Sequence, residues 1–266
     1  MQPTGPYAED LRLAMRIADS VDRFTLANFA GGNLTVELKA DETPVTAVDR
    51  GAEEMIRQAL ERERKDDAVY GEEFGSKGGS ARQWIIDPVD GTKNFIRDIP
   101  VWATLIALVD ERKPVVGVVS APALGMRWFA AKGDGAWKGT SLRHAEPIAV
   151  SKRAELDAAM LSYSSLSGWE ERGMLPDFLE LTRRVWRTRA FGDFLSYMMV
   201  AEGVVEIAAE PDLALYDMAA LVPIVEEAGG VFTSLAGVPG PFGADAVATN
   251  GALHASVLEI VGTAEI

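Results

Sequence analysis

The stretch Trp84-Ile85-Ile86-Asp87-Pro88-Val89-Asp90-Gly91-Thr92-Lys93-Asn94-Phe95 decides how this chain of 266 residues is interpreted. Its apolar start predicts a buried strand, and its Gly-Thr pair predicts the opening of a helical turn. Because a proline disfavours a helical residue before it, Asp87 is expected to be extended and to point, with Asp90, beyond the strand end. Carboxylates suit a hard cation such as Mg²⁺, and amides at a helix start suit phosphate. The stretch therefore predicts a metal-dependent phosphate enzyme.

The composition narrows the classes of function. The net charge of −14 argues against nucleic acid as a partner, because such a surface needs a basic patch. The chain has no cysteine, which excludes thiolate ligands and leaves oxygen ligands or His144 and His254, to which we assign no chemistry. No apolar run reaches the roughly 18 residues of a membrane span, and the N-terminus lacks a signal-peptide layout. We expect a soluble, cytoplasmic protein without a membrane partner.

The first half of the chain reads as an α+β unit. Apolar residues at helical spacing predict a helix over residues 7–29, and a second helix is expected to open at Asp49. A strand is expected over residues 34–39, and another over 68–71 that ends in Glu72 and Glu73. Three runs separated by short breakers then predict an antiparallel meander, over residues 102–109, 115–120 and 127–131.

The second half alternates strands and helices, which is the α/β pattern. Strands are expected over residues 160–164, 207–209 and 231–234, and helices over 175–184, 194–202, 216–228 and after Asn250. Pro223 should kink the third of these helices. We therefore expect an N-terminal metal-binding half with an antiparallel sheet, residues 1–150, and a C-terminal α/β half, residues 151–266, with the active cleft between them.

Several motifs occur together in a fixed order. Gly71-Glu72-Glu73 precedes the Asp87 stretch, and Tyr216-Asp217-Met218-Ala219-Ala220 follows far downstream, before Glu226-Glu227-Ala228-Gly229-Gly230. This set resembles the inositol monophosphatase superfamily of magnesium-dependent, lithium-sensitive phosphatases over nearly the whole chain. The resemblance implies an α/β fold of αβαβα layers, shared with fructose bisphosphatases, and two or three Mg²⁺ ions per site, with Mn²⁺ as a substitute. The chain departs from the family at Tyr216, where tryptophan is usual.

The resemblance also implies a ligand set. Glu72, Asp87 and the carbonyl of Val89 resemble the ligands of a first metal. Asp87, Asp90 and Asp217 resemble those of a second, so Asp87 would bridge the two. Asp217 also falls in the first turn of a predicted helix, where a carboxylate is favoured as a cap, and both roles can hold together.

Catalytic roles follow from the same resemblance. Glu72 with Thr92 would activate the attacking water, Thr92 being oriented by Asp49, and no phosphoenzyme is expected. The amides of Gly91 and Thr92 would hold the phosphate, and Asp217 or a water would help the leaving alkoxide take a proton. From the residues alone, Asp49 is also a plausible helix cap. Lys39 lies one residue closer to Asp49 than the comparable basic residue of animal members, and it is left out of the set.

Substrate choice must come from the second half. Residues 186–197, with 100–108 and 162–169, are similar to the actinobacterial histidinol-phosphate phosphatase branch of the family. Histidinol phosphate carries an ammonium group and an imidazole, so it should be met by carboxylates, and Asp193 and Glu210 are the candidates. A helix N-cap is an equally good interpretation of Asp193. Arg187 and Arg189 are assigned to an interface or to ion pairs.

The leading hypothesis is hydrolysis of L-histidinol phosphate to L-histidinol and phosphate, in histidine biosynthesis. Inositol-1-monophosphatase activity is the alternative within the family. Nucleotide 3′-phosphatase and fructose bisphosphatase are disfavoured, because the chain lacks their extra length. A non-enzymatic binding or regulatory role is the alternative of another class. Asp90→Asn would separate this role from catalysis, because a phenotype that survives the loss of turnover would favour the binding role. By resemblance, the protein is expected to be a homodimer.

Overall fold

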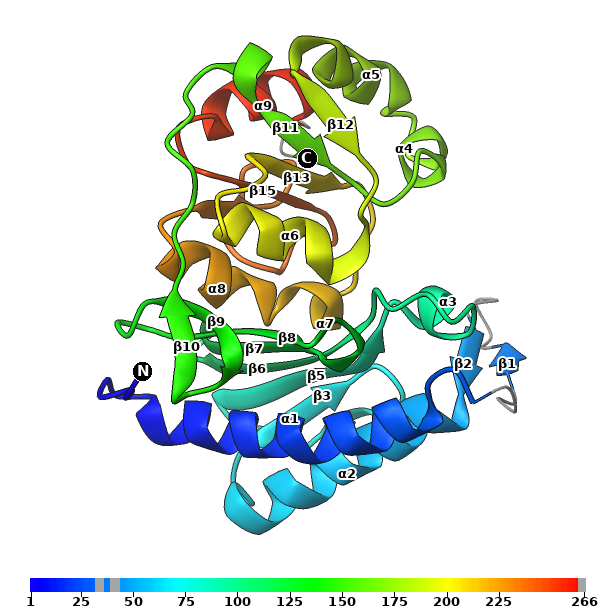
Figure 1. Ribbon diagram of the computed structural model, residues 1–266, viewed down its shortest axis with the longest axis vertical. Coiled ribbons are helices and arrows are strands. Elements are labelled where there is room, and N and C mark those ends of the chain that lie inside the picture. The colour runs from blue at the N-terminus through cyan, green and yellow to red at the C-terminus, as the bar shows by residue number, and fades with distance from the viewer. Residues whose placement is uncertain (32–35, 39–43, 263–266) are drawn as a thin grey trace.

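A computed structural model describes residues 1–31, 36–38 and 44–262 of the chain. Figure 1 shows its elements stacked in layers, with a helix pair below a large sheet, helices between that sheet and a smaller one, and further helices on the far side. This is the αβαβα arrangement that the sequence predicts, so the fold-class prediction is confirmed. The division at residue 150 stays a prediction.

The larger sheet has eight strands and holds the Asp87 stretch near one edge. Its spatial order is β10-β9-β8-β7-β6-β5-β3-β4. Only the β3–β5 pair is parallel, so the predicted antiparallel meander is confirmed and extends further than expected. The strands are β3 (Ala68–Gly71), β4 (Gly75–Lys77), β5 (Arg82–Asp90), β6 (Ala103–Asp110), β7 (Lys113–Ala121), β8 (Met126–Ala131), β9 (Ala136–Ser141) and β10 (His144–Pro147).

Both faces of this sheet are covered, which explains why its central strands are apolar at nearly every position. On one face α1 (Ala8–Asn28) and α2 (Ala47–Glu63) pack against Trp84, Ile86 and Ile106. The alternate residues Ile85 and Leu105 point the other way, into the core shared with the second half of the chain. A small antiparallel pair, β1 (Val36–Leu38) and β2 (Pro44–Thr46), leads into α2.

The smaller sheet has five strands in the order β12-β11-β13-β15-β14. Strand β11 is parallel to both its neighbours, and β15 is antiparallel to both of its own. The strands are β11 (Met160–Ser162), β12 (Arg187–Arg189), β13 (Ile207–Glu210), β14 (Val231–Thr233) and β15 (Ala246–Thr249). Its outer face is covered by α4 (Ser167–Glu171), α5 (Leu175–Arg184) and α9 (His254–Val261).

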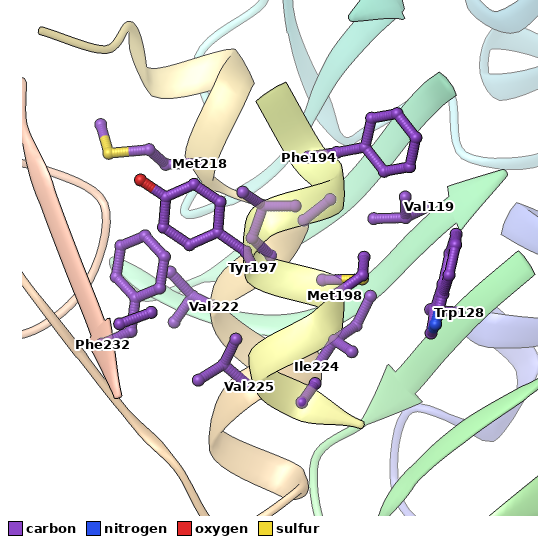
Figure 2. Close-up of a cluster of buried hydrophobic side chains, with 14 of the residues drawn as sticks. Val119, Trp128, Phe194, Tyr197, Met198, Met218, Val222, Ile224, Val225 and Phe232 are labelled. Carbon is purple, nitrogen blue, oxygen red and sulfur yellow. The ribbon is translucent and has the colours of Figure 1, made fainter. Parts of the chain in front are cut away.

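The middle layer joins the two sheets. Helices α6 (Asp193–Ala201) and α8 (Leu221–Glu227) lie side by side there, and the short α7 (Leu215–Met218) comes directly before α8 in the chain. Figure 2 shows their buried side chains, with Trp128 and Val119 of the large sheet on one side and Phe232 of the small sheet on the other. The orientation of the residues at the two helix starts is therefore set by packing against both sheets.

The helix expected over residues 216–228, with a kink caused by Pro223, is interrupted before that proline. The chain forms two helices, α7 and α8, that are separated at Ala219 and Ala220. Pro223 is consequently the third residue of α8, in the first turn, where a backbone N–H would have no partner within the helix. The proline is accommodated by a break before it, so α7 can orient Asp217 separately from α8.

The strand expected over residues 34–39 is seen as β1, and Lys39 and residues 34–35 lie outside the described residues. Within residues 1–31, 36–38 and 44–262, no helix combines the length and the apolarity needed to cross a membrane.

Candidate active site

A cleft of about 630 Å³ opens where the ends of β5 and β13 face the starts of α6 and α7. The described residues that line it include Lys93 and seven carboxylates: Glu72, Asp90, Glu171, Asp193, Glu210, Asp212 and Asp217. They come from both halves of the chain. A cleft this acidic should bind cations, whether metal ions or a cationic substrate.

The end of β5 brings its two aspartates to the base of the cleft. The β5–β6 register shifts between Asp87 and Asp90, as expected where a proline cannot donate to the ladder. Asp87 is buried, and its Oδ1 accepts the N–H of Val89 at 3.0 Å. The carbonyl of Val89 accepts the hydroxyl of Thr92 at 2.9 Å. This turn fixes the side chains and the carbonyl that the sequence analysis assigned to metal binding.

The Gly-Thr pair opens a one-turn helix, as predicted. Gly91 has φ 84°, in the left-handed region, and α3 (Thr92–Phe95) follows it. A Cβ at Gly91 would lie 2.8 Å from the carbonyl oxygen of Val101, so both conformation and space require glycine here. The first amides of α3 have no acceptor within the helix, which leaves them available to an anion.

Three carboxylates meet at one point. One oxygen each from Asp87, Asp90 and Asp217 lies within 4.8 Å of the others. Burial, then the neighbouring charges, raise the pKa of Asp87 and of Asp90 well above the ordinary value. Burial also raises the pKa of Asp217 to about 7, against the opposing effect of the Ala214 N–H, which donates to Asp217 at 2.7 Å. Such a cluster of hard oxygen donors fits divalent cations such as Mg²⁺.

Glu72 completes the acidic group from the side of β3. Its carboxyl raises the pKa of Asp87, second only to burial, so the two side chains are neighbours. Its backbone N–H donates to the carbonyl of Ile86 at 3.3 Å, which ties the β3 end to β5 just before Asp87. The structure thus brings Glu72 together with Asp87, Asp90 and Asp217, as the sequence analysis predicted.

Asp49 acts both as a cap and as a contact of Thr92. It is the third residue of α2, and its Oδ2 accepts the Thr46 N–H at 2.8 Å in a capping box. Its Oδ1 accepts the hydroxyl of Thr92 at 3.0 Å. The structure therefore shows both the cap and the contact with Thr92, and the capping box holds the carboxylate beside the Thr92 hydroxyl.

Asp193 links the halves and is not the N-cap that one interpretation expected. It follows the N-cap Gly192 and has φ 48°, rare for a residue other than glycine. Its Oδ2 accepts the side-chain N–H of Asn94 at 2.8 Å, and its own N–H donates to Ser164 at 3.0 Å. The next N–H, of Phe194, donates to Asp90 at 2.8 Å. The start of α6 is thereby fastened to the end of β5.

Glu210 lies deeper in the cleft, at the end of β13. Burial raises the pKa of Glu210 to about 8, although hydrogen bonds from Ser164 oppose this. Its Oε1 is buried without a hydrogen-bond partner, and so is the hydroxyl of Tyr197 on α6. Buried polar atoms in a cleft are costly unless a ligand or water bonds them. Glu210 is therefore suited to receive a polar group of a substrate.

Arg187 and Arg189 are exposed on β12, outside the cleft lining. His144 is exposed, whereas His254 is half-buried on α9 with Thr233 and Thr249 within hydrogen-bond distance of its ring. Asn94 and Ser164 were missed, although both lie in stretches that the sequence analysis quoted; only the fold brings them to Asp193.

Comparison with known proteins agrees with this geometry. A family model described as the inositol monophosphatase family matches residues 8–264. A histidinol-phosphatase of Streptomyces coelicolor is 56% identical over 256 residues, covering 95% of this chain and 96% of that protein. One of Mycobacterium tuberculosis is 54% identical, covering 94% and 96%. A solved structure of an IMPase from Thermotoga maritima superposes with a TM-score of 0.84 at 29% identity, covering 95% and 96%.

Proposed function

The chain belongs to the inositol monophosphatase family of phosphoric monoester hydrolases, and from this premise we propose that it hydrolyses L-histidinol phosphate to L-histidinol and phosphate. The observation that carries the proposal is the pairing of a carboxylate cluster at the end of β5 with two further carboxylates, Asp193 and Glu210, on the other wall of the same cleft. The first set suits metal-assisted phosphate chemistry, and the second suits a substrate with an ammonium group.

We propose that two or three Mg²⁺ ions occupy the cleft, with Mn²⁺ able to replace them. Glu72, Asp87 and the Val89 carbonyl would hold one ion, and Asp87, Asp90 and Asp217 would hold another. The donors are all hard oxygens, and three lie within 4.8 Å of one another. When bound, such ions neutralise charge that develops on the phosphate and lower the pKa of water.

Glu72 and Thr92 would prepare the attacking water. Thr92 Oγ1 is placed by the carboxylate of Asp49 at 3.0 Å and the Val89 carbonyl at 2.9 Å. The hydroxyl proton is engaged with these acceptors, so the lone pairs of Oγ1 can accept a hydrogen bond from the water. Glu72 would take one proton of the water as the new oxygen–phosphorus bond forms, and the other proton stays on the phosphate product. The N–H groups of Gly91 and Thr92 would hold the phosphate oxygens in line.

The leaving group needs a proton when its ester bond to phosphorus breaks. Asp217 faces the same point as Asp87 and Asp90, so it can orient a water there beside the departing oxygen. Asp217, or a water beside it, would protonate the departing oxygen of histidinol. The electron pair of the broken bond stays on that oxygen. Because water is the proposed nucleophile, no covalent enzyme intermediate would form.

The substrate assay tests the choice of substrate. With Mg²⁺, we expect kcat/KM for histidinol phosphate to exceed that for inositol 1-phosphate, and Glu210→Gln to raise KM for histidinol phosphate about tenfold, because one charged hydrogen bond is lost. Asp212→Asn is the control, since Asp212 is an exposed carboxylate at the same cleft that pairs with Arg172. A specificity constant that favours inositol 1-phosphate would refute the substrate, and an unchanged KM in Glu210→Gln would refute the role of Glu210.

We also propose that the protein is a homodimer. Trp186, which directly precedes β12, is 58% exposed, and Leu166 is 42% exposed; β12 is an edge strand of the small sheet. Large exposed apolar side chains and an open strand edge are features that association covers. Sedimentation should give twice the 28.6 kDa of the chain, and Trp186→Asp should shift the protein toward monomer. A wild-type protein that sediments as a monomer at micromolar concentration would exclude the dimer.

A further inference from the structure

Helix α2 presents three charged residues to the same side, one turn apart. Asp49, Glu53 and Arg57 are spaced by four residues, so they lie along one face of the helix. Asp49 contacts Thr92, as described above. Glu53 is fully buried, at 0% exposure. A carboxylate is rarely buried to this degree unless its oxygens accept hydrogen bonds, so Glu53 should have donors close to its carboxylate oxygens.

Glu53 binds the turn that carries Glu72. Its Oε2 accepts the backbone N–H of Glu73 at 2.7 Å, and its Oε1 accepts that of Phe74 at 3.2 Å. These are the two amides that follow Glu72 in the turn between β3 and β4. The carboxylate therefore fixes the backbone on the C-terminal side of Glu72, while the Glu72 N–H is fixed by the Ile86 carbonyl at 3.3 Å.

Gly71, at the start of the turn, shows how closely Glu53 approaches it. A Cβ added at Gly71 would lie 2.3 Å from Oε1 of Glu53 and 2.8 Å from Oε2. Its conformation alone does not require glycine, so the requirement is for space beside the carboxylate. The turn and the Glu53 side chain can occupy these positions together only because residue 71 has no side chain.

Arg57 completes the support. Its Nε donates to Glu53 Oε1 at 2.7 Å, and its guanidinium also donates to the carbonyl of Gly75, at the far end of the turn. The same guanidinium lies 5.9 Å from the centre of the Phe74 ring. A buried carboxylate with an arginine and two backbone donors is fully compensated, so this group can be rigid.

We propose that Glu53 is a positioning residue for the reaction: it holds the Glu72–Phe74 turn so that the Glu72 carboxylate stays beside Asp87. The inference rests on the proposed function of Glu72. Glu53 itself contacts neither substrate nor reacting atoms. Since Asp49 positions Thr92 from the first turn of α2, the two groups proposed to prepare water would both be oriented by one face of one helix.

The test replaces Glu53 by glutamine in the full-length protein. Glutamine keeps the volume but has only one acceptor oxygen, so one of the two turn amides, or Arg57, would face an NH₂ group instead. We expect kcat to fall about 10- to 100-fold and the Mg²⁺ concentration at half-maximal activity to rise about tenfold, the size expected when support for a ligand is lost. Glu54→Gln is the matched control, because Glu54 is the exposed neighbour on α2.

Two readouts separate positioning from simple loss of stability. A fraction of irreversibly misfolded protein lowers the apparent kcat but leaves the Mg²⁺ midpoint of the folded protein unchanged, whereas a displaced Glu72 moves it. Circular dichroism at the assay temperature, with and without Mg²⁺, checks that the variant is not in equilibrium with unfolded chain. Titration of the protein with Mn²⁺, followed by the electron paramagnetic resonance of free Mn²⁺, should show the same loss of affinity without any turnover. If Glu53→Gln does not fold, Arg57→Lys, which keeps a cation but loses one donor, should move both midpoints in the same direction by less.

Unchanged Mg²⁺ and Mn²⁺ midpoints in a folded Glu53→Gln protein, or in Arg57→Lys if that protein must be used, would overturn the inference. Glu72→Gln distinguishes this failure from failure of the proposed function. If Glu72→Gln is inactive and Glu53→Gln behaves as wild type, only the positioning role is lost. If Glu72→Gln keeps full activity, the proposed role of Glu72 is wrong, and the inference about Glu53 fails with it.

Discussion

Asp217→Asn is expected to lower kcat by on the order of 10³-fold and, in the metal-free protein, to raise the melting temperature. Activity falls because the change removes a charged oxygen that would hold a divalent ion and would orient the water that protonates the leaving oxygen. In the metal-free protein, stability rises because the carboxylate of Asp217 lies against those of Asp87 and Asp90 and no metal ion offsets the repulsion between them. Asparagine keeps an oxygen that can accept the Ala214 N–H, so the capping contact at α7 survives.

The gain in stability should depend on pH in a defined direction. The pKa of Asp217 is about 7 in the fold against 3.8 in the unfolded chain, so folding takes up a proton at intermediate pH. The stability that this group contributes is therefore complete below the unfolded pKa and is lost as pH rises through the folded pKa. Asparagine cannot titrate, so the advantage of the variant over wild type should grow between about pH 5 and about pH 7.5.

Thermal unfolding in a chelator, at the two pH values, measures this effect. Adding Mg²⁺ should stabilise the wild type strongly and Asp217→Asn weakly, which reverses their order. Asp212→Asn, at the exposed rim of the cleft, should follow the wild type throughout. A variant that is less stable than wild type without metal at both pH values would contradict the assignment of Asp217 to an uncompensated acidic cluster.

Glu72→Gln should retain the fold and lose about 10²- to 10⁴-fold in kcat, the range for removal of a general base. Glutamine has nearly the same size, and the turn around Glu72 is held through backbone groups by Ile86 and Glu53, so its position should not change.

Rapid mixing of the Glu72→Gln protein with substrate, followed by phosphate release, measures the loss directly. Glu171→Gln is the control, since Glu171 is an exposed carboxylate on the rim of the same cleft. Wild-type turnover in Glu72→Gln would show that another group takes the proton from water. A loss confined to KM would assign Glu72 to binding instead of to chemistry.

The sequence predicted the acidic cluster because each part of it lies next to residues that constrain the local backbone. Asp87-Pro88 and Gly91-Thr92 each constrain their own backbone, and the structure shows an extended strand end and a helical turn at these positions. Asp49 and Asp217 lie in the first turns of helices, a position where a carboxylate can be recognised from the sequence pattern. Periodicity likewise predicted α1 and α5 nearly to the residue.

What the sequence did not predict depends on contacts between distant segments. Asn94 and Asp193 are 99 residues apart, and only the docking of α6 against β5 brings them to 2.8 Å. Glu53 looks like any charged residue of an amphipathic helix until the β3–β4 turn covers it. A kink at Pro223 was predicted, but the separation into two helices was not, because Tyr216–Ala228 keeps helical spacing of apolar residues. Packing against the two sheets, not the local pattern, sets where each piece lies.

The hydrogen bond from Phe194 N–H to Asp90 has a consequence for redesign of the enzyme. The side chains proposed to bind metal come mainly from the large sheet, whereas those proposed to bind the alcohol come from α6 and β13. Loops of the second half could therefore be exchanged to change the substrate while the hydrolytic machinery is kept. Such exchanges must leave the backbone at Phe194 unchanged, because the Phe194 N–H donates to the Asp90 carboxylate and helps to orient it.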